Sequence, residues 1–502
     1  MKKYIFFRIL RSLISIILVT TVAYAMIFAL VPRNSIFIGD TAYSRLKGDP
    51  DKRTNYENSV FRKMGYIDYI QLDDIARQIT GKTEGAEFDA ILENKNEAAI
   101  QQWEEENRKD GWELHQLPMA KTYYATREIP VIQRVLRFYA NIFEIDHPWK
   151  VHDPDNPDLP RYIRFENTPE AGFTLTGSGT QHKYLLYFNS SFPFIHQNII
   201  KLNLGISYPT FQSRGVMDVI FSGQGKADSR EITFETGKTE VSSINIYSRQ
   251  YQEASKIDRL QRERFNDNYT LTSNNYQDPS MAQISMSMGV VALLITYIVG
   301  LSAAVFMARH KGRWGDRIGI GIVTVLISVP SLAFVYLFRF IGNNVFRLPA
   351  DFPVLGGQDI RSYIVPTIIL GLLSVSGLVI WVRRYMIDQA SSDYVHFARA
   401  KGLSEREISQ KHILKNAMIP IVNQIPGAVI LSITGATITE TVFAVPGMGK
   451  MLPDAIKAYN NSMVIGLVFI FTSLSILSVL LGDILMTIID PRINLSVKKG
   501  AH

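Results

Sequence analysis

Two segments of the chain contain residues of the kind that bind a phosphate group. Gly81-Lys82-Thr83 and Gly237-Lys238-Thr239 have the sequence that ends a phosphate-binding loop. Such a loop needs another glycine five residues earlier, so that backbone N–H groups can surround the phosphate. Ala76 and Ile232 occupy those two positions. We therefore interpret both segments as turns and expect this chain to bind no cofactor of its own.

The chain also lacks the side-chain patterns of common hydrolases and metal enzymes. It has no cysteine, which excludes a disulfide framework, a thiol nucleophile and a cysteine-based metal site. Its nine histidines include no His-Glu-x-x-His pair, and no Ser-His-Asp or paired-carboxylate pattern stands out. We expect no catalytic residue and no metal site, so energy for any uphill process must come from another protein.

Apolar residues are gathered in long blocks along the 502 residues, of which 47% are hydrophobic. Several blocks are about 20 residues long with few charges, the length that crosses a bilayer core of roughly 30 Å. A buried core helix would account for one such block but not for the set. Six membrane spans are predicted: Ile9–Val31, Ile284–Ala308, Ile318–Phe340, Tyr363–Val382, Ile419–Phe443 and Val464–Ile489.

The net charge of +7 would suit a nucleic-acid partner, but the placement of the charges indicates a membrane instead. Lys and Arg gather before the first span, between the second and third, between the fourth and fifth, and after the last. The alternate loops, 341–362 and 444–463, are poor in both. Cytoplasmic loops carry the excess of basic residues. We therefore predict cytoplasmic termini, an external segment between the first two spans, and no nucleic-acid partner.

The first span has a competing interpretation as a cleaved signal peptide. Ala23-Tyr24-Ala25 matches a cleavage site after a basic start and an apolar stretch. The apolar run continues to Val31, however, so cleavage would cut the span in the middle. We favour a retained helix.

The segment 32–280 has mixed periodicity and predicts an α+β domain outside the membrane. Ala86–Asn107 is expected to be a helix, and Pro130 to start a second one whose apolar residues recur at three and four. Strands are expected at Lys183–Phe188, Arg230–Glu235 and Ser243–Tyr247, and a strap back to the membrane at Gln250–Met281. A further apolar stripe consists of Val216, Val219 and Ile220, which fits a helix on the membrane surface or a soluble amphipathic helix equally well.

The loop between the fourth and fifth spans predicts a rigid elbow. Asp393–Ala400 is expected to form a short helix with Tyr394, Phe397 and Ala398 on one face. Gly402 is placed to end that helix, because glycine adopts the left-handed cap without steric cost. Ser404 and Glu407 then have the spacing of a capping box that starts the next helix. A loop of this order has the stiffness to transmit force from a cytoplasmic partner, although a plain surface hairpin has the same signature.

The elbow resembles the "EAA" loop of binding-protein-dependent ABC importer permeases, in the version of dipeptide and oligopeptide permeases. The residues that carry the resemblance are Ala398-Arg399-Ala400-Lys401-Gly402-Leu403-Ser404, His412 to Pro420, Val31-Pro32, Asn203 to Tyr208, Ser328-Val329-Pro330-Ser331, Thr439 to Lys450 and Asp490-Pro491-Arg492. The loop departs from Glu-Ala-Ala at His396-Phe397-Ala398, so the residue that fills the role of the glutamate is left open. The large external domain is similar to that of the B-type permease in the Opp and Ami oligopeptide importers of streptococci.

The resemblance implies a type I ABC importer permease fold and an oligopeptide import subunit without its own ATPase site. Implied partners are a second homologous permease, two cytoplasmic ATPases that use ATP and Mg²⁺, a lipid-anchored external peptide-binding protein, peptide and membrane lipid, in a Gram-positive cell membrane. The implied division is 1–31, 32–280, 281–490 with a coupling loop at 383–418, and a tail at 491–502. The resemblance also implies that the loop 393–420 contacts the ATPases, through Tyr394, Phe397, Ala398, Arg399, Ala400, Lys401, Gly402, Ser404 and Glu407.

Three charged residues, Arg339, Glu440 and Asp483, lie in or near apolar blocks and are candidates for a pathway or for intramembrane polar contacts. Snorkelling to the interface is the alternative for Arg339 and Glu440. Asp483 lies deeper and favours a buried polar contact.

Two other classes of protein remain as alternatives. A receptor that senses peptides would normally carry a cytoplasmic output domain, whereas the cytoplasmic parts here are short loops. A self-sufficient secondary transporter would show internal repeats with unwound membrane helices, and none is visible.

Overall fold

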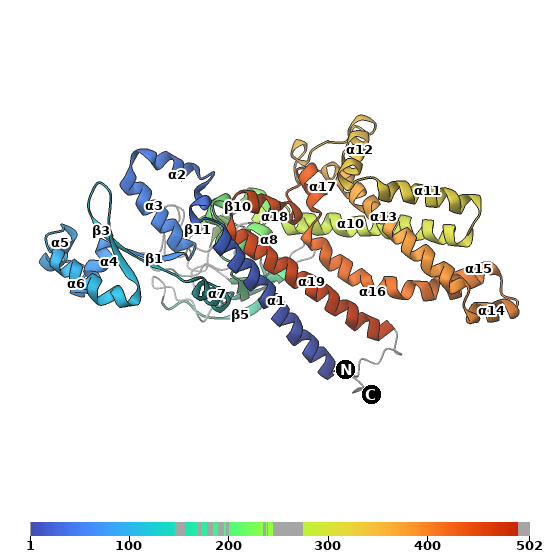
Figure 1. Ribbon diagram of the computed structural model, residues 1–502, viewed down its shortest axis with the longest axis horizontal. Coiled ribbons are helices and arrows are strands. Elements are labelled where there is room, and N and C mark those ends of the chain that lie inside the picture. Colours follow the sequence, from blue (N-terminus) through green and yellow to red (C-terminus); the bar gives the residue numbers. More distant parts are fainter. Residues whose placement is uncertain are drawn as a thin grey trace.

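The computed structural model describes residues 2–145, 157–168, 172–177, 184–188, 195–196, 200–233, 237, 239–243 and 275–489. Long helices form a bundle at one end of the molecule (Figure 1). We call the segment between the first and second long helices, residues 32–280, the insertion. Most of its described part lies at the other end of the molecule from the bundle (Figure 1). The tail at 491–502 and the motif at 490–492 lie outside the described residues, as do residues 244–274, which include most of the expected strap and the end of the expected strand at 243–247.

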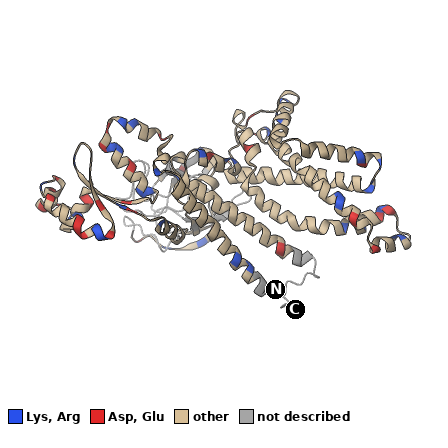
Figure 2. Cartoon of the chain, viewed as in Figure 1, with Lys and Arg blue, Asp and Glu red and all other residues tan. Residues whose placement is uncertain are grey.

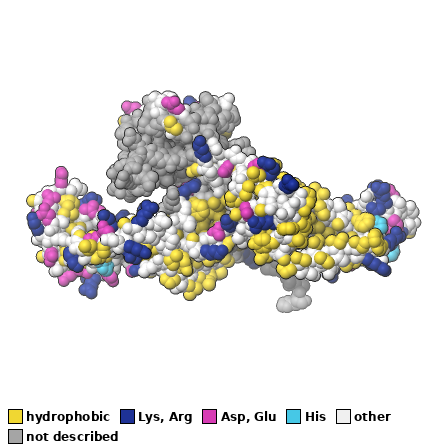
Figure 3. All heavy atoms as spheres, turned by 90° about the horizontal axis from the view of Figure 1, so that it is seen from above, with side chains coloured by type: hydrophobic (Ala, Val, Ile, Leu, Met, Phe, Trp, Pro, Cys, Tyr) yellow, Lys and Arg dark blue, Asp and Glu magenta, His cyan; other side chains and the backbone are white. Residues whose placement is uncertain are grey.

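The bundle confirms a membrane-spanning helical architecture. Five helical segments of the described chain are long and apolar enough to cross a membrane, and a sixth results if one bent pair counts as a single span. The long helices of the bundle are α1 (Lys2–Leu30), α10 (Met281–Arg309), α13 (Arg361–Ala390), α16 (Lys415–Leu431) and α19 (Asn461–Ile489), and the bent pair is α11 (Trp314–Ser328) with α12 (Ser331–Asn344). Hydrophobic side chains cover most of the surface of this half of the molecule, and charged side chains gather toward both ends (Figures 2 and 3).

Two predicted spans are divided between shorter helices. In the predicted span Ile318–Phe340, α11 and α12 meet at an angle of 106°. Pro330 has no N–H to continue α11, and Val329 before it is extended. The expected span Ile419–Phe443 is also interrupted, because α16 ends at Leu431 and a 3₁₀ turn, η8 (Ser432–Thr434), leads to Gly435 with φ +78° and then to α17 (Thr437–Val442).

Small residues allow the helices of the bundle to approach closely. A Cβ on Gly371 of α13 would lie 3.0 Å from the carbonyl oxygen of Ala292 in α10. At the same place the Thr296 hydroxyl lies 2.8 Å from the carbonyl oxygen of Gly371, to which it donates. In membrane bundles such close contacts replace the hydrophobic drive that is missing in lipid. Pro366 and Pro426 do not break their helices, since α13 and α16 continue through them.

The insertion is an α+β domain built from small antiparallel sheets and short helices, as its pattern predicts. Its strands are β1 (Ile67–Gln71), β2 (Trp112–Gln116), β3 (Tyr123–Glu128), β4 (Phe143–Ile145), β5 (Ile163–Thr168), β6 (Gly172–Gly177), β7 (Tyr184–Phe188), β8 (Ile195–His196), β9 (Ile200–Leu202), β10 (Gln224–Thr233), β11 (Thr239–Ser243) and β12 (Asn275–Asp278). They form sheets in the orders β1-β3-β2, β5-β6-β7-β8, β11-β10-β12 and β4-β9.

The described helices of the insertion lie before and between these strands. They are α2 (Thr41–Arg45), α3 (Pro50–Lys63), α4 (Leu72–Thr80), α5 (Ala86–Leu92), α6 (Glu97–Asn107), α7 (Val131–Ala140) and α8 (Val216–Phe221). The single helix expected over Ala86–Asn107 is therefore wrong. Asn94 adopts φ +55°, and the side chain of Asn96 accepts a hydrogen bond from the Ala99 N–H to start α6.

Helix α8 is amphipathic and buries its apolar stripe in protein, which rules out the interpretation as a helix on the membrane surface. Val216, Val219 and Ile220 are at most 3% exposed. They pack in one apolar cluster with Met448 of α18 (Met448–Lys457) and Leu467 of α19. The stripe therefore joins the insertion to the bundle and does not lie on a membrane surface.

A buried polar seam makes a second junction between the insertion and the start of α19. The side-chain amide of Asn460, fully buried, donates to the hydroxyls of Ser207 and Thr210 at 2.8 and 2.7 Å. That of Asn461 donates to the Tyr66 hydroxyl at 2.9 Å. Because each amide is paired, the desolvation of these groups is compensated, and the insertion is fixed to α19 by hydrogen bonds of defined direction.

Asp40 organises the insertion side of this seam. Its carboxylate accepts hydrogen bonds from the hydroxyls of Tyr208 and Tyr56 and from the N–H groups of Tyr43 and Ala42. Burial opposes ionisation, but the hydrogen bonds outweigh it and hold the pKa of the Asp40 carboxyl below its usual value.

The lowered pKa of Asp40 predicts an acid-sensitive contribution to stability. A carboxyl whose pKa is lowered by folding stabilises the fold above the pKa of the unfolded chain, and this stabilisation is lost as the pH falls through the folded-state pKa. Asp40→Asn should therefore destabilise the insertion at neutral pH by about 1–3 kcal/mol. Thermal unfolding of the purified protein between neutral and acidic pH measures this, and the gap between wild type and variant should close in acid.

Asp110→Asn, at an exposed turn, is the matched control and should behave as wild type at every pH. A gap for Asp40→Asn that stays constant into acid would contradict the role of its charge.

Candidate coupling site

The elbow between α13 and α16 forms as the sequence predicts. Helix α14 (Asp393–Ala400) ends with Gly402 at φ +79°. The Leu403 N–H donates to the Ala398 carbonyl and the Gly402 N–H to the Arg399 carbonyl, at 3.3 and 2.9 Å. These two bonds define a Schellman motif. A Cβ on Gly402 would meet nothing within 4 Å, so the backbone conformation, not lack of space, requires glycine here.

The second arm of the elbow starts with the expected capping box. The Glu407 N–H donates to the Ser404 hydroxyl at 3.3 Å, and the Ser404 N–H donates to the Glu407 carboxylate at 3.4 Å. Helix α15 (Glu405–Glu407) then continues as a π-helix, η7 (Ile408–Leu414), into α16. Arg399 and Glu405 form an ion pair at 2.7 Å, which closes the two arms across Gly402.

The inner face of the elbow is part of the core of the bundle. Val395 and Ile408 are fully buried and Ala398 is 6% exposed. They share one apolar cluster with residues of α10, α13 and α16, namely Ala304, Met307, Val375, Val379, Val382, Met386, Ala417 and Ile421. Because a packed core transmits displacement with little compression, this packing joins the elbow firmly to the ends of these three helices.

The outer face of the elbow is exposed, and only some of the nine predicted coupling residues lie on it. Phe397 is 67% exposed, with the Lys401 ammonium 5.4 Å from its ring centre. The expectation that Tyr394, Phe397 and Ala398 share a face is wrong, because Ala398 is buried and Tyr394 half-buried against the cluster. Glu407 is also half-buried. Besides Phe397, the exposed members of the nine predicted residues are Arg399, Ala400, Lys401, Gly402 and Ser404.

A buried ion pair that the sequence analysis missed supports the same end of the bundle. Arg383 of α13 donates from Nε and one terminal nitrogen to the two carboxylate oxygens of Asp316 in α11, at 2.7 and 2.8 Å. Asp316 is 1% exposed and also accepts from the Gly312 N–H. The sequence analysis counted Arg383 among many basic loop residues. The signal that could have revealed the pair was Asp316, an acidic residue in a basic stretch of sequence.

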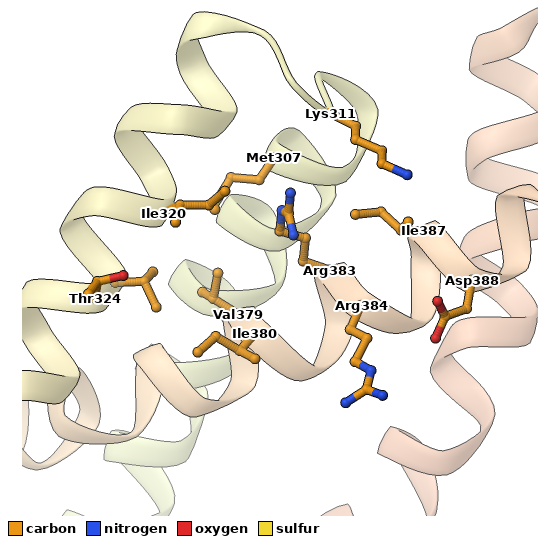
Figure 4. Close-up of a pocket in the computed structure, with 11 residues that line it drawn as sticks. Met307, Lys311, Ile320, Thr324, Val379, Ile380, Arg383, Arg384, Ile387 and Asp388 are labelled. Atoms are coloured by element: carbon orange, nitrogen blue, oxygen red, sulfur yellow. The ribbon is translucent and has the colours of Figure 1, made fainter.

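A cavity of about 430 Å³ lies beside this ion pair, between α10, α11 and α13 (Figure 4). Its walls are mostly apolar, with Met307, Ile320 and Val379 among them, and Arg383 and Arg384 also line it. It lies next to the helix ends on which the elbow packs. Within the described part of the chain, no group of three or more His, Asp or Glu side chains is arranged to hold a metal.

Two of the three predicted intramembrane charges are paired by neighbouring elements. Asp483 of α19 pairs with Arg8 of α1, so α1 is joined to the bundle by charge as well as by packing. Arg339 of α12 pairs with Asp351 at 2.6 Å and donates to the Ala350 carbonyl at 2.9 Å. Neither contact depends on a bound ligand, and both account for a charge beside an apolar block.

Glu440, the third, is 1% exposed and connects α10 to the segment that follows α16. One carboxylate oxygen accepts from the Ser285 hydroxyl at 2.8 Å and from the Ala436 N–H at 3.0 Å. The other accepts from the Lys450 N–H at 2.9 Å. Gly435 and Gly447 leave no room for a Cβ beside this carboxylate, so Glu440 holds a tight polar turn and does not snorkel.

The chain is similar to known membrane transport proteins. A family model described as the binding-protein-dependent transport system inner membrane component matches residues 297–495. The chain is 52% identical to the oligopeptide transport system permease protein AmiC of Streptococcus pneumoniae, over 100% of both chains. It is 34% identical to the dipeptide transport system permease protein DppB of Lactococcus lactis, over 42% of this chain and 69% of that protein.

A solved structure of the MetNI methionine ABC transporter in inward-facing conformations aligns with a TM-score of 0.35 and 16% identity, over 42% of this chain and 94% of that one; this likeness is too low to carry an argument. The relative that is 52% identical over the whole length of both chains shows the family. The chain belongs to the binding-protein-dependent transport permeases, and the bundle has their type I ABC permease fold.

The elbow geometry predicts that Gly402→Val loosens the elbow locally. A non-glycine residue in the left-handed conformation costs roughly 1–2 kcal/mol, which should speed hydrogen exchange of the amides between Ala398 and Ile408 roughly 5- to 30-fold. Exchange mass spectrometry of the purified protein measures it. Gly312→Val, at a glycine with φ +77° in the α10–α11 loop, is the control and should leave exchange in the elbow unchanged. Equal exchange in the elbow of wild type and Gly402→Val would refute this role.

Glu440→Gln should destabilise the bundle, because a side-chain amide presents N–H groups where backbone N–H groups already point. The expected loss is about 1–3 kcal/mol, read as a lower unfolding temperature of the purified protein. Asp454→Asn, at a 52% exposed carboxylate of α18, should change little. If both substitutions lowered the unfolding temperature equally, the buried hydrogen bonds would not be the cause.

Proposed function

We propose that this chain is a membrane-spanning permease subunit of an ATP-driven oligopeptide importer and forms half of the translocation pathway. The observation that carries the proposal is 52% identity, over the whole length of both chains, to an oligopeptide transport system permease protein. The stiff elbow supports the same function, because it gives the bundle an exposed contact surface. Among the permeases of such importers, the B type is the assignment that the large insertion favours.

The proposed motor is separate from this chain. Two cytoplasmic ATPases hydrolyse ATP with Mg²⁺, and each receives an elbow in a groove on its surface. In this chain the residues for that contact are the exposed ones, with Phe397 at the centre and Arg399 and Lys401 beside it. Closure of the ATPases tilts the elbow, and the apolar cluster passes the displacement to α10, α13 and α16. A second homologous permease completes the pathway, and the alternating opening of the two permeases moves peptide inward.

The proposed orientation places the elbow and both termini in the cytoplasm of a Gram-positive bacterium. Charged residues lie at the elbow end and across the insertion, whereas the middle of the bundle carries few (Figure 2). The turn after α10 is basic, with Arg309, Lys311 and Arg313, as cytoplasmic loops are. The insertion then lies outside, where a lipid-anchored peptide-binding protein docks on it and delivers peptide.

Phe397→Arg tests the contact with the ATPases. A charged guanidinium in place of an apolar ring should prevent docking in an apolar groove, because a buried charge without a partner is costly. We expect loss of ATPase subunits from the affinity-purified complex and loss of ATP-dependent peptide uptake in cells, while the permease pair and its membrane insertion persist.

Met119→Arg is the matched control, since Met119 is 70% exposed on the insertion, far from the elbow. It should retain both ATPases. Full co-purification of the ATPases with Phe397→Arg would remove this residue from the contact, and normal peptide uptake in a strain that lacks this permease would overturn the proposed function itself.

A further inference from the structure

Helix α7 of the insertion has an apolar face that no described part of the chain covers. Ile132 is 77% exposed and Leu136, one turn later, is 64% exposed. Phe143, in β4 directly after the helix, is also 64% exposed. Side chains four residues apart lie on one side of a helix, so Ile132 and Leu136 form one surface. Phe143 is a further exposed apolar side chain, three residues after the helix end.

The basic residues of α7 are held on the insertion. Arg134 donates to the Ile129 and Tyr66 carbonyls at 2.7 and 3.1 Å. Arg137 pairs with Asp68 at 3.4 Å. Both guanidinium groups are therefore occupied by the insertion, and the charged and apolar sides of α7 are separated as in helices that lie at a bilayer surface.

Contacts with α1 place α7 beside a membrane-spanning helix. Arg134 lies 5.3 Å from the ring centre of Phe28, and the rings of Phe138 and Tyr24 are 5.8 Å apart. Further along both helices, the Tyr139 hydroxyl donates to the Ile17 carbonyl at 2.9 Å and lies 3.0 Å from the Thr21 hydroxyl.

These contacts descend along α1. Phe28 is near the end of the apolar segment Phe6–Leu30, whereas Ile17 is near its middle. From residue 28 to residue 17 a helix rises about 16 Å, half of a bilayer core. The C-terminal part of α7 thus reaches the level of membrane-spanning residues of α1, among them the exposed Leu18 and Val22.

We propose that α7 is embedded in the half of the bilayer nearer the insertion and that lipid acyl chains cover Ile132, Leu136 and Phe143. The occupant is lipid because α7 packs along α1, whose exposed apolar residues Leu18 and Val22 lie at the same depth. Unpaired ionised side chains would be disfavoured there, and those of α7 are paired with groups of the insertion. The insertion is thereby anchored to the membrane through a helix of its own, in addition to its junctions with α19.

Single-cysteine spin labelling tests this placement, because the chain has no native cysteine. Leu136→Cys is labelled with a nitroxide and measured in the complete transporter in lipid nanodiscs, with cysteine-free partner subunits. Collision with oxygen, which enriches in lipid, is compared with collision with a neutral nickel chelate, which stays in water. Leu18→Cys is the lipid reference, Met119→Cys the water reference, and Gln133→Cys the adjacent face of the same helix.

The expected ratio of oxygen to nickel accessibility at residue 136 is close to that at residue 18 and several-fold above that at residue 119, with a lower ratio at residue 133. Nickel accessibility at residue 136 equal to that at residue 119 would place α7 in water and overturn the proposal. A label at residue 136 that meets neither reagent would show a protein partner on this face and would overturn it as well. Ile132→Cys repeats the measurement one turn earlier and guards against a local effect of the label.

Discussion

The packing of the elbow into the bundle is the contact on which the proposed transport mechanism depends. Val395, Ala398 and Ile408 are buried among residues of α10, α13 and α16, so the elbow has no independent freedom. Hydrogen bonds fix its shape, through the Schellman motif at Gly402 and the capping box at Ser404. One side-chain hydrogen bond, from the Tyr394 hydroxyl to the Gln389 carboxamide oxygen at 2.8 Å, ties the elbow to α13. The other side chains that hold the elbow on the helices do so by apolar burial, which is roughly proportional to area and independent of direction. That combination suits a lever, because a stiff element on a mostly apolar surface can rotate slightly while few directed bonds break.

At the other end of the bundle, directed hydrogen bonds, with apolar packing in addition, join α19 to the insertion. Asn460 and Asn461 at the start of α19 hydrogen-bond to the insertion, and Asp40 fixes the tyrosine that packs beside them. Directed bonds between buried polar groups tolerate little sliding, since a displaced partner leaves an unpaired donor or acceptor. The insertion is therefore fixed in orientation on α19, while the apolar contact of α8 adds area to the same junction. In the proposed mechanism, the elbow end of the bundle therefore moves while the insertion keeps its orientation on α19.

Much of this arrangement follows from local sequence rules, and the exceptions have physical causes. The elbow was predictable because Gly402, Ser404 and Glu407 act on backbone groups within a few residues of themselves. The bend at Pro330 had a local signal too, but its angle of 106° depends on what α12 packs against. The Arg383–Asp316 pair joins residues 67 positions apart. An acidic residue in a basic loop draws attention to Asp316, but no local pattern identifies Arg383 as its partner. Phe397 and Ala398 are neighbours in the sequence, yet only the bundle decides that Ala398 is buried and Phe397 exposed.

The two short apolar helices of the insertion show why a stripe alone does not identify its partner. Val216 and Ile220 of α8 and Ile132 and Leu136 of α7 give similar sequence patterns, with apolar residues one turn apart. The first pair is buried against α18 and α19, and the second is exposed beside α1. Periodicity reports that one side of a helix avoids water; whether protein or lipid provides the alternative depends on the element opposite. For α7 that element is a membrane-spanning helix whose own neighbouring surface is exposed and apolar, so the same force that buries α8 in protein directs α7 to the bilayer.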